Sequence, residues 1–410
     1  MAAILLMNDG RYDMDKETIN ILTINAGSSS IKFALYEMSD QPVLTFSGKI
    51  ERIGLSDTML TTKENGKEAK QPINAPDFHT AALSLMEWLE KQSFFQEVDV
   101  IGHRIVHGLK HTHAEAITND LLQTLSKIAD YDPDHLPSEI ELIQLFQQKR
   151  SQLLQIACFD TAFHTTLPPV AKTFAIPKKY YAEGIQRYGF HGISYSYLME
   201  ELKRKNEEAA KGRIILAHLG SGASMAAVLN EKCIDTTMGF TPAGGLVMGT
   251  RSGDLDPGIA WYLMQKGMDA QAFNHLINHQ SGLLGISGTS ADMQDLVQQQ
   301  KDNEDAAMAI DIYCYQVKKY IGAFTAVLGG LDILVFSGGV GENADMIRSH
   351  ICKGLDYAGV ELNEEQNQQN EELISDIESA VKVYVIHTNE ELMIAKSTAA
   401  MYVQCENIKR

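Results

Sequence analysis

The sequence has 410 residues, of which 44% are hydrophobic and 21% are charged, and its formal net charge is −18. This length is enough for two domains with substantial cores, and the negative charge argues against nucleic acid or an anionic membrane surface as a general partner. An anionic substrate therefore has to be attracted by local arginines and lysines rather than by the overall field.

The five cysteines are scattered and form no C-x-x-C pair, which is typical of a reduced, cytoplasmic protein. Residues 2–7 are apolar, but acidic residues follow them, and the basic start and cleavage site of a signal peptide are missing. We interpret residues 1–17 as an extension. We expect no membrane segment, because no apolar run approaches the length of a membrane span.

The first stretch with recognisable chemistry spans residues 19–36, where two β-rich runs flank a turn of one glycine and three serines. Such a turn points backbone N–H groups and hydroxyls into one small space, as is needed to hold phosphate oxygens. We predict Ser28 and Ser30 as a phosphate loop, and Lys32 follows at a spacing that brings an ammonium group to the same anion. Taken alone, the stretch is equally compatible with an ordinary hairpin that has a polar tip.

A second copy of this pattern lies about half the chain length further on, at residues 215–229, around the turn Gly220-Ser221-Gly222. Internal similarity on this scale predicts a duplicated domain with a cleft between the halves. Two phosphate-cradling hairpins that face each other are typical of nucleotide-dependent phosphotransferases with an actin-like, sugar-kinase-like (ribonuclease H-like) fold. The sequence has no G-x-x-x-x-G-K-[ST] loop, which excludes a P-loop enzyme.

We therefore predict an α/β protein with two related domains, each a mixed sheet flanked by helices. The N-terminal domain is expected to span residues 18–160 and to recover the last helix, residues 391–410. The second, nucleotide-binding domain is expected to span residues 161–390.

Periodicity predicts the elements of the first domain. A strand is expected at 43–53, an amphipathic helix at 77–92 and a second helix at 118–129. A short buried strand at 98–101 is expected to end before Arg104. Ser138 is expected to cap a further helix, because Glu141 three residues later completes a capping box.

Several polar residues at predicted strand ends are candidates for the site, and each has a structural alternative. Arg104 is either an anion clamp or part of a core salt bridge. Asp160, after the strand that begins near Gln155, either orients substrate or metal or caps a helix. His191 is either a buried structural histidine or a donor to a transferring group.

Glycine-rich segments dominate the second half. The long loop 241–258 carries Arg251 and two carboxylates, and ordered loops of this length are usually functional. An apolar helix is expected at 305–328. A buried strand at 333–336 then runs into a glycine turn and a helix start, which is typical of an anion or nucleotide seat.

These residues carry a resemblance to the acetokinase family of acetate kinases, which extends from about Ile19 to Ala395. The matching blocks lie in the right order at residues 25–32, 102–108, 159–164, 188–191, 248–254, 338–343 and 388–391. The resemblance implies reversible phosphoryl transfer from ATP to acetate, which gives acetyl phosphate and ADP, with Mg²⁺ or Mn²⁺ and in a homodimer.

The resemblance also implies roles for individual residues. Asn25 and Glu390 would hold the metal, and Lys32 would lie near the nucleotide phosphates. The implied catalytic residues are Arg104, Asp160, His191 and Arg251. The acid would contact Arg104, Val106, Asp134, Phe190 and Pro242. The nucleotide would contact His218, Leu219, Gly220, Ser221, Gly222, Asp292, Met293, Gln294, Gly339, Val340, Gly341, Glu342 and Asn343.

Elementary acid–base chemistry limits the role of Asp160. A small carboxylic acid has a pKa of roughly 4–5, like a glutamate side chain, and is already ionised near pH 7. No general base is needed to activate it, so we expect Asp160 to orient an arginine or the metal.

The chain departs from the family pattern at Ser221, where the family has asparagine, and at Gln294, where it has arginine. These changes put nucleotide affinity in question. Asp134 stands where the family has an apolar residue, and the loop at 241–245 has lost a larger residue and an acid, which predicts a wider or wetter acyl pocket. The alternatives are a kinase for propionate or butyrate, and a nucleotide-binding pseudo-kinase of the same fold.

Overall fold

The computed structural model describes residues 18–27 and 29–409. The predicted extension over residues 1–17 and Ser28 of the predicted phosphate loop lie outside these described residues. The chain forms two compact units: the first extends to Ala162 and resumes at Asn389, and the second spans Phe163–Thr388. Both junctions lie two residues from the predicted domain boundaries.

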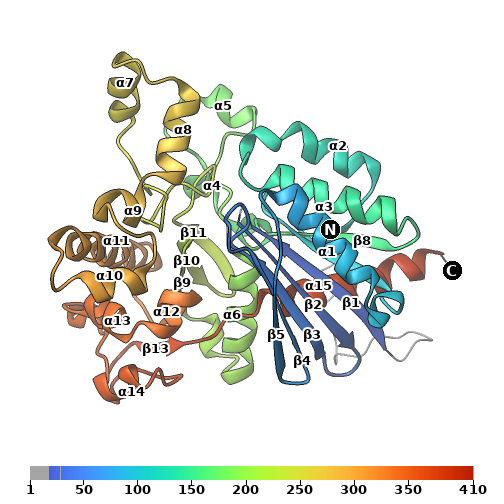
Figure 1. Cartoon of the computed structure of the whole chain (residues 1–410). Helices are drawn as coiled ribbons and strands as arrows, with labels where there is room; N and C mark the ends of the chain where they lie inside the picture. The colour runs from blue at the N-terminus through green and yellow to red at the C-terminus, as the bar shows by residue number, and fades with distance from the viewer. Residues whose placement is uncertain (1–17, 28, 410) are drawn as a thin grey trace. The chain divides into compact units, whose positions relative to one another are not determined.

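In the described residues, the first unit is built on an eight-stranded sheet with the order β5-β4-β3-β2-β1-β6-β8-β7 (Figure 1). The central strand β1 pairs antiparallel with β2 and parallel with β6. The strands are β1 (Ile19–Ala26), β2 (Ser30–Met38), β3 (Val43–Glu51), β4 (Met59–Glu64), β5 (Lys67–Pro72), β6 (Val100–Ile105), β7 (Glu115–Ala116) and β8 (Leu154–Phe159).

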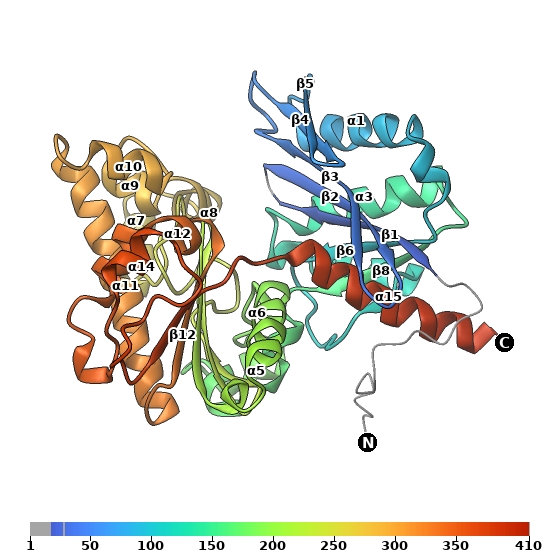
Figure 2. The same ribbon diagram turned by 90° about the horizontal axis from the view of Figure 1, so that it is seen from below.

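Helices cover both faces of this sheet. The helices are α1 (Phe78–Glu90), α2 (Asn119–Lys127), α3 (Leu136–Lys149) and α15 (Glu390–Lys409), with 3₁₀ turns η1 (Ser93–Gln96) and η2 (Ala129–Tyr131). Side chains of α1 and α3, among them Leu85 and Phe146, pack with Ile101 of β6 in one apolar core. The opposite face is covered by α15, which lies along β1, β6 and β8 (Figure 2).

Gly102 of β6 permits the close approach of α15. A Cβ atom at this position would lie 2.1 Å from Oγ1 of Thr398 and 2.9 Å from Cγ2 of Ile394. We therefore expect Gly102→Ala to lower the free energy of unfolding by about 1–3 kcal/mol, as overpacking typically does. Urea denaturation measures this, with Gly322→Ala inside α11 (Glu304–Leu328) as the control. That control replaces a helix glycine and should be neutral or stabilising, so equal losses in both variants would contradict the packing argument.

The second unit, as far as it is described, contains a five-stranded sheet with the order β11-β10-β9-β12-β13. The strands are β9 (Arg213–Leu219), β10 (Ala223–Leu229), β11 (Lys232–Thr236), β12 (Ile333–Ser337) and β13 (Lys382–Val385). Two antiparallel pairings are followed by two parallel ones, as in the series β3-β2-β1-β6-β8 of the first unit. The repeated pairing confirms the predicted α/β fold with two related mixed sheets.

Two helices lie directly on this second sheet. Tyr195, Leu198 and Leu202 of α6 (Gly192–Lys205) pack on Ile214 and Leu216 of β9. Helix α11 packs on β9 and β10 and ends at the left-handed Gly329. The other helical segments are η3 (Ala162–Thr166), α4 (Pro169–Lys172), α5 (Lys178–Ala182), η4 (Ala209–Lys211), α7 (Pro257–Gln265), α8 (Ala270–His279), α9 (Gly282–Ser287), α10 (Met293–Gln299), α12 (Gly338–Asn343), α13 (Asp345–Cys352), η5 (Asp356–Ala358) and α14 (Glu364–Gln368).

Two local predictions were wrong. The strand predicted at 98–101 continues as β6 through Arg104 to Ile105, so Arg104 projects from the strand itself. The capping box at Ser138 does not exist, because α3 begins at Leu136 with His135 as its N-cap. Pro137 occupies the first turn, where the N–H that proline lacks has no helical partner anyway.

Within the described ranges, no helix has both the length and the apolar character that crossing a membrane requires.

Candidate active site

The two predicted metal residues lie together in the first unit. Asn25 is buried near the end of β1, and its Nδ2 donates to Oε2 of Glu390 at 2.8 Å and to Oε1 of Glu391 at 3.3 Å. Glu390 is the first residue of α15, which Gly102 allows to reach the sheet. The fold therefore joins residues from opposite ends of the sequence.

The donor chemistry of this pair fits Mg²⁺. Among the described residues, no three His, Cys, Asp or Glu side chains are grouped to hold a metal ion by themselves. Mg²⁺ does not require such a group, since it is commonly held by one or two carboxylates together with substrate phosphates and water. Glu390 and the amide of Asn25, once its oxygen is turned toward the ion, supply such ligands.

Arg104 lies in a buried group of acidic residues. Its Nη2 donates to Oδ2 of Asp160 at 2.8 Å, its Nη1 donates to the carbonyl oxygen of Ala26 at 3.4 Å, and Nη1 lies 3.7 Å from Oε1 of Glu139. Burial alone would lower the pKa of Arg104, but the neighbouring acidic residues, Asp160 foremost, outweigh it and hold this pKa above its ordinary value. The guanidinium is thus a fixed positive charge with a fixed orientation.

The carboxylate of Asp160 faces Arg104. Its side chain is fully buried, and its backbone N–H donates to the carbonyl oxygen of Ile105 at 2.9 Å. The structure thus places Asp160 as a direct partner of Arg104.

The residues predicted to bind the acid divide between the units. Val106 follows β6 and is buried, and Asp134 lies half-buried in the segment before α3. Phe190 and Pro242 belong to the second unit, and both are buried.

Lys32 lies opposite Asn25 in the β1–β2 pairing. It lines a cavity of about 280 Å³ on the first unit together with Tyr36, Asn389 and Glu391. Ser30 closes the turn between β1 and β2, because its carbonyl oxygen accepts from the N–H of Gly27 at 2.8 Å.

His191 of the second unit is held by a hydroxyl network. It precedes α6 with a left-handed backbone, φ 60°, which is uncommon for a residue other than glycine and tends to occur at functional sites. Its Nδ1 lies 2.9 Å from Oγ of Ser224, which also bonds to the hydroxyl of Tyr195. The ring of His218 lies beside it, with the centroids 4.4 Å apart.

The turn between β9 and β10 is the meeting point of the predicted phosphate contacts in this unit. A Cβ atom at Gly222 would lie 3.3 Å from Nε2 of His191 and 3.9 Å from Nη1 of Arg251, so both side chains lie against the turn. The N–H of Gly249 donates to the carbonyl oxygen of Ser221 at 2.9 Å, which fixes the Arg251 loop to it.

The start of α12 lies next to the same turn. A Cβ atom at Gly220 would lie 3.8 Å from the backbone nitrogen of Gly339. Glycine turns and N–H groups from two segments thus adjoin, as a phosphate-binding site requires.

Comparison with known proteins shows the family of this chain. A match to the acetokinase family covers residues 20–396. The chain belongs to the acetokinase family. It is 42% identical over 395 residues to an acetate kinase of Thermoanaerobacterium thermosaccharolyticum, which covers 93% of this chain and 98% of that protein. An acetate kinase of Halothermothrix orenii is 40% identical over 394 residues, which cover 93% and 99%.

Solved structures of an acetate kinase and of a propionate kinase are also similar. The Porphyromonas gingivalis acetate kinase matches with a TM-score of 0.83 and 36% identity, over 94% of this chain and all of that one. A propionate kinase from Francisella tularensis matches with a TM-score of 0.86 and 36% identity, over 93% of this chain and all of that one.

Three acidic residues of this acetokinase accept hydrogen bonds from backbone N–H groups of the protein itself. Glu342 accepts from the N–H groups of Gly338 at 2.9 Å and Thr388 at 3.0 Å, which supports the start of α12. Asp292 caps α10 by accepting from the N–H of Gln294 at 2.7 Å, and the side chain of Gln294 is exposed. Asp254 closes the Arg251 loop by accepting from the N–H of Gly245 at 2.9 Å.

Sequence reasoning missed the residues that support the acetokinase histidines. Ser224 contacts His191, and Ser194 bridges Nδ1 of His218 and Oγ1 of Thr388 at 2.8 Å each. Ser224 and Ser194 are fully buried. A serine inside an otherwise apolar strand or helix face is a signal that would have found them, because a buried hydroxyl requires a partner.

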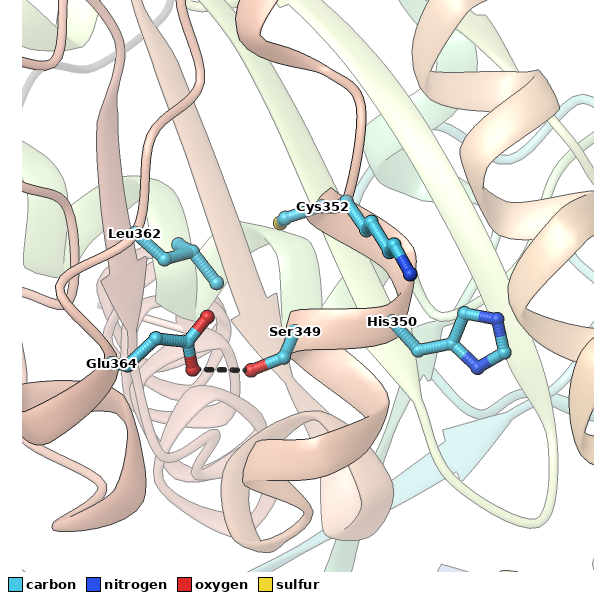
Figure 3. Close-up of a pocket in the computed structure, with 6 residues that line it drawn as sticks. Ser349, His350, Cys352, Leu362 and Glu364 are labelled. Carbon is cyan, nitrogen blue, oxygen red and sulfur yellow. Dashed lines mark hydrogen bonds between the residues drawn. The ribbon is translucent and has the colours of Figure 1, made fainter.

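A further cavity of about 470 Å³ adjoins α13 and α14 (Figure 3). Its walls carry Ser349, whose hydroxyl donates to Oε2 of Glu364 at 2.7 Å. The other lining residues are His350, Cys352, Lys353 and Leu362. None of these six belongs to the residues matched to the acetokinase site, so we do not assign this cavity to it.

Proposed function

We propose that this protein transfers the γ-phosphoryl group of ATP reversibly to acetate, which gives acetyl phosphate and ADP. The observation that carries the proposal is that the family-matched residues gather within each unit. Asn25, Arg104, Asp160 and Glu390 meet in the first, and His191, His218 and Arg251 meet at a glycine turn in the second.

Phosphoryl transfer depends on positioning and on neutralising charge rather than on covalent help from the protein. Arg104 is proposed to bind the acid carboxylate, which is ionised at neutral pH and needs no base. Asp160 orients Arg104, and the apolar side chain of Val106 contacts the alkyl part of the acid.

Asn25 and Glu390 are proposed to hold Mg²⁺, or Mn²⁺, with the nucleotide phosphates. When bound, the ion neutralises negative charge on those phosphates. Lys32 lies at the next strand and adds a further positive charge for them.

The nucleotide is proposed to bind the second unit along the β9–β10 turn and the start of α12. Arg251 and Nε2 of His191 face the turn and stabilise the equatorial oxygens of the moving phosphoryl group. Ser224 keeps the imidazole in place through its Nδ1.

A hydroxamate assay with acetate, propionate and butyrate, each with ATP and Mg²⁺, tests the proposal. We expect an acyl phosphate from at least one of these acids and from acetate first. A preference for propionate is the second candidate, because the half-buried Asp134 lies in the predicted pocket and a propionate kinase is among the similar structures. ATP binding without transfer to any short acid would instead identify a pseudo-kinase.

We also propose that the protein forms a homodimer through α7 and α8. From the sequence alone, the apolar stretches at 259–264 and 310–328 are compatible with either core or interface. Residues of α11 such as Tyr313 and Phe324 are buried, whereas no residue of α7 or α8 in the described structure is. Trp261 is 67% exposed and Tyr262 59%, and apolar exposure of this kind marks an interaction surface.

Trp261→Lys is therefore expected to convert a dimer into a monomer. A lysine on an apolar interface has to lose its water on association, which is unfavourable. Light scattering after gel filtration gives the mass, and Tyr357→Lys, at a residue 74% exposed elsewhere in the second unit, is the control. A wild-type protein with the mass of one chain would refute the dimer.

None of the five cysteines, all of which lie in the described residues, forms a disulfide, and four of them are buried. This agrees with a reducing compartment, and we propose that the enzyme is cytoplasmic.

A further inference from the structure

Glu139 is a buried carboxyl group next to the proposed acid-binding residues. It lies in the first turn of α3, and only 3% of the residue is exposed. The backbone N–H of Val106 donates to both of its oxygens, at 3.0 and 3.2 Å, and its Oε1 lies 3.7 Å from Nη1 of Arg104. Glu139 therefore contacts both Arg104, which is proposed to bind the carboxylate of the acid, and Val106, which is proposed to contact its alkyl group.

The charges around Glu139 do not balance if every carboxyl group is ionised. It faces Arg104 from β6, Asp160 after β8, and Asp132 before α3, whose partner is His135. Arg104 is also in direct contact with Asp160. A single guanidinium cannot neutralise two buried carboxylates, and an uncompensated buried charge is normally removed by protonation.

Burial raises the pKa of Glu139 to about 8, although Arg104 and the Val106 N–H act to lower it. The neutral acid is thus favoured at pH 7. Arg104 keeps Asp160, whose Oδ2 lies 2.8 Å from its Nη2, as its direct partner.

We propose that Glu139 is a positioning residue for the acid substrate, which holds the Arg104 guanidinium and the Val106 backbone in a fixed relation. This inference rests on the proposed function. Through Glu139, helix α3 and the segment with Asp134 directly before this helix help to determine which acids bind. A neutral Glu139 leaves Arg104 to the substrate, whereas an ionised Glu139 competes with the substrate carboxylate for the same guanidinium.

Three variants test this inference. Glu139→Gln keeps an acceptor for the Val106 N–H but cannot ionise, and Glu139→Ala removes the acceptor. Glu141→Gln is the control, because Glu141 lies on the same helix, pairs with His79 and is partly exposed. The measurements are KM for acetate, KM for ATP and the propionate-to-acetate ratio of kcat/KM, from pH 6.5 to 9.5.

In the wild type and in Glu141→Gln, we expect KM for acetate to rise above about pH 8. In Glu139→Gln this rise should disappear. In Glu139→Ala, KM for acetate should rise about tenfold or more at every pH, because the Val106 N–H is left buried and unpaired, and the propionate-to-acetate ratio should shift. KM for ATP should stay within about twofold, since Glu139 acts on the residues that bind the acid and not on the nucleotide.

A second readout needs no turnover. The folded protein binds a proton at Glu139 that the unfolded chain, with a pKa of about 4.3, releases. Relative to Glu139→Gln, the wild type should therefore lose unfolding free energy as pH rises from about 5 to 8.5. Calorimetric binding of acetate without ATP measures the positioning effect independently of catalysis.

The inference is overturned if Glu139→Ala keeps the wild-type affinity for acetate, or if KM for acetate and KM for ATP rise together. It is also overturned if Glu139→Gln keeps the wild-type pH dependence. A wild type that binds acetate but makes no acyl phosphate refutes the proposed function alone, and the calorimetric comparison of the variants still decides the role of Glu139.

Discussion

Replacing Arg104 with alanine is expected to lower kcat/KM for acetate by about a thousandfold or more. Charge-assisted, two-pronged contacts to a carboxylate are among the strongest hydrogen bonds in proteins, and loss of one preorganised donor typically costs about 10²–10³ in rate. Steady-state kinetics with acetate varied at saturating ATP measures the effect. Arg104→Lys should recover only part of it, because lysine keeps the charge but not the planar fork.

The same substitution should also weaken the fold. Without Arg104, Asp160 and Glu139 remain buried beside each other, and breaking a buried pair in this way costs about 3–5 kcal/mol. Urea denaturation therefore has to accompany the kinetics. Arg150→Ala is a matched control in the same unit, because Arg150 donates to the carbonyl oxygen of Phe95 and stacks on its ring, away from the proposed site. A normal KM for acetate in Arg104→Ala would refute the assigned role.

Replacing Arg251 with alanine is expected to reduce kcat by about 10²–10³, with a smaller change in KM for ATP. Arg251 is half-buried and lies against the β9–β10 turn, and the sulfur of Met248 is 3.8 Å from its Nη1. A charge that acts on the moving phosphoryl group contributes mainly to the transition state. The kinetic effect should therefore appear in kcat.

Arg213→Ala provides the comparison for Arg251. Arg213 pairs with Asp332 on the surface of the same unit, where such pairs contribute about 0–1 kcal/mol. Both variants should fold, and only Arg251→Ala should be slow. Equal activity in the two would remove Arg251 from the mechanism.

The fold was predictable because the duplicated hairpins are local signals. An apolar strand, a turn of small residues and a second apolar strand define β1–β2 and β9–β10 without any knowledge of the partners. The joining of Asn25 to Glu390 was not visible in the spacing, since it depends on α15 returning to the first sheet at Gly102. Only the family resemblance connected these two residues.

Glu139 shows why part of the site escaped prediction. The predicted capping box at Ser138 drew attention to Glu141 and not to Glu139, and α3 in fact begins at Leu136. The helical spacing did hold a signal, because Glu139 precedes Ile143 and Phe146 by four and seven residues on the buried face. An acidic residue on an apolar helix face requires a partner, and here Arg104 and the Val106 N–H supply it.

The most direct test of the proposed phosphoryl transfer is to identify its phosphorus-containing products. Phosphorus NMR of the wild-type protein with ATP, Mg²⁺ and acetate should show acetyl phosphate and ADP appearing in equal amounts, and neither should form when acetate is omitted. ADP formed with inorganic phosphate at a rate that does not depend on any short acid, or no turnover despite bound ATP, would contradict it.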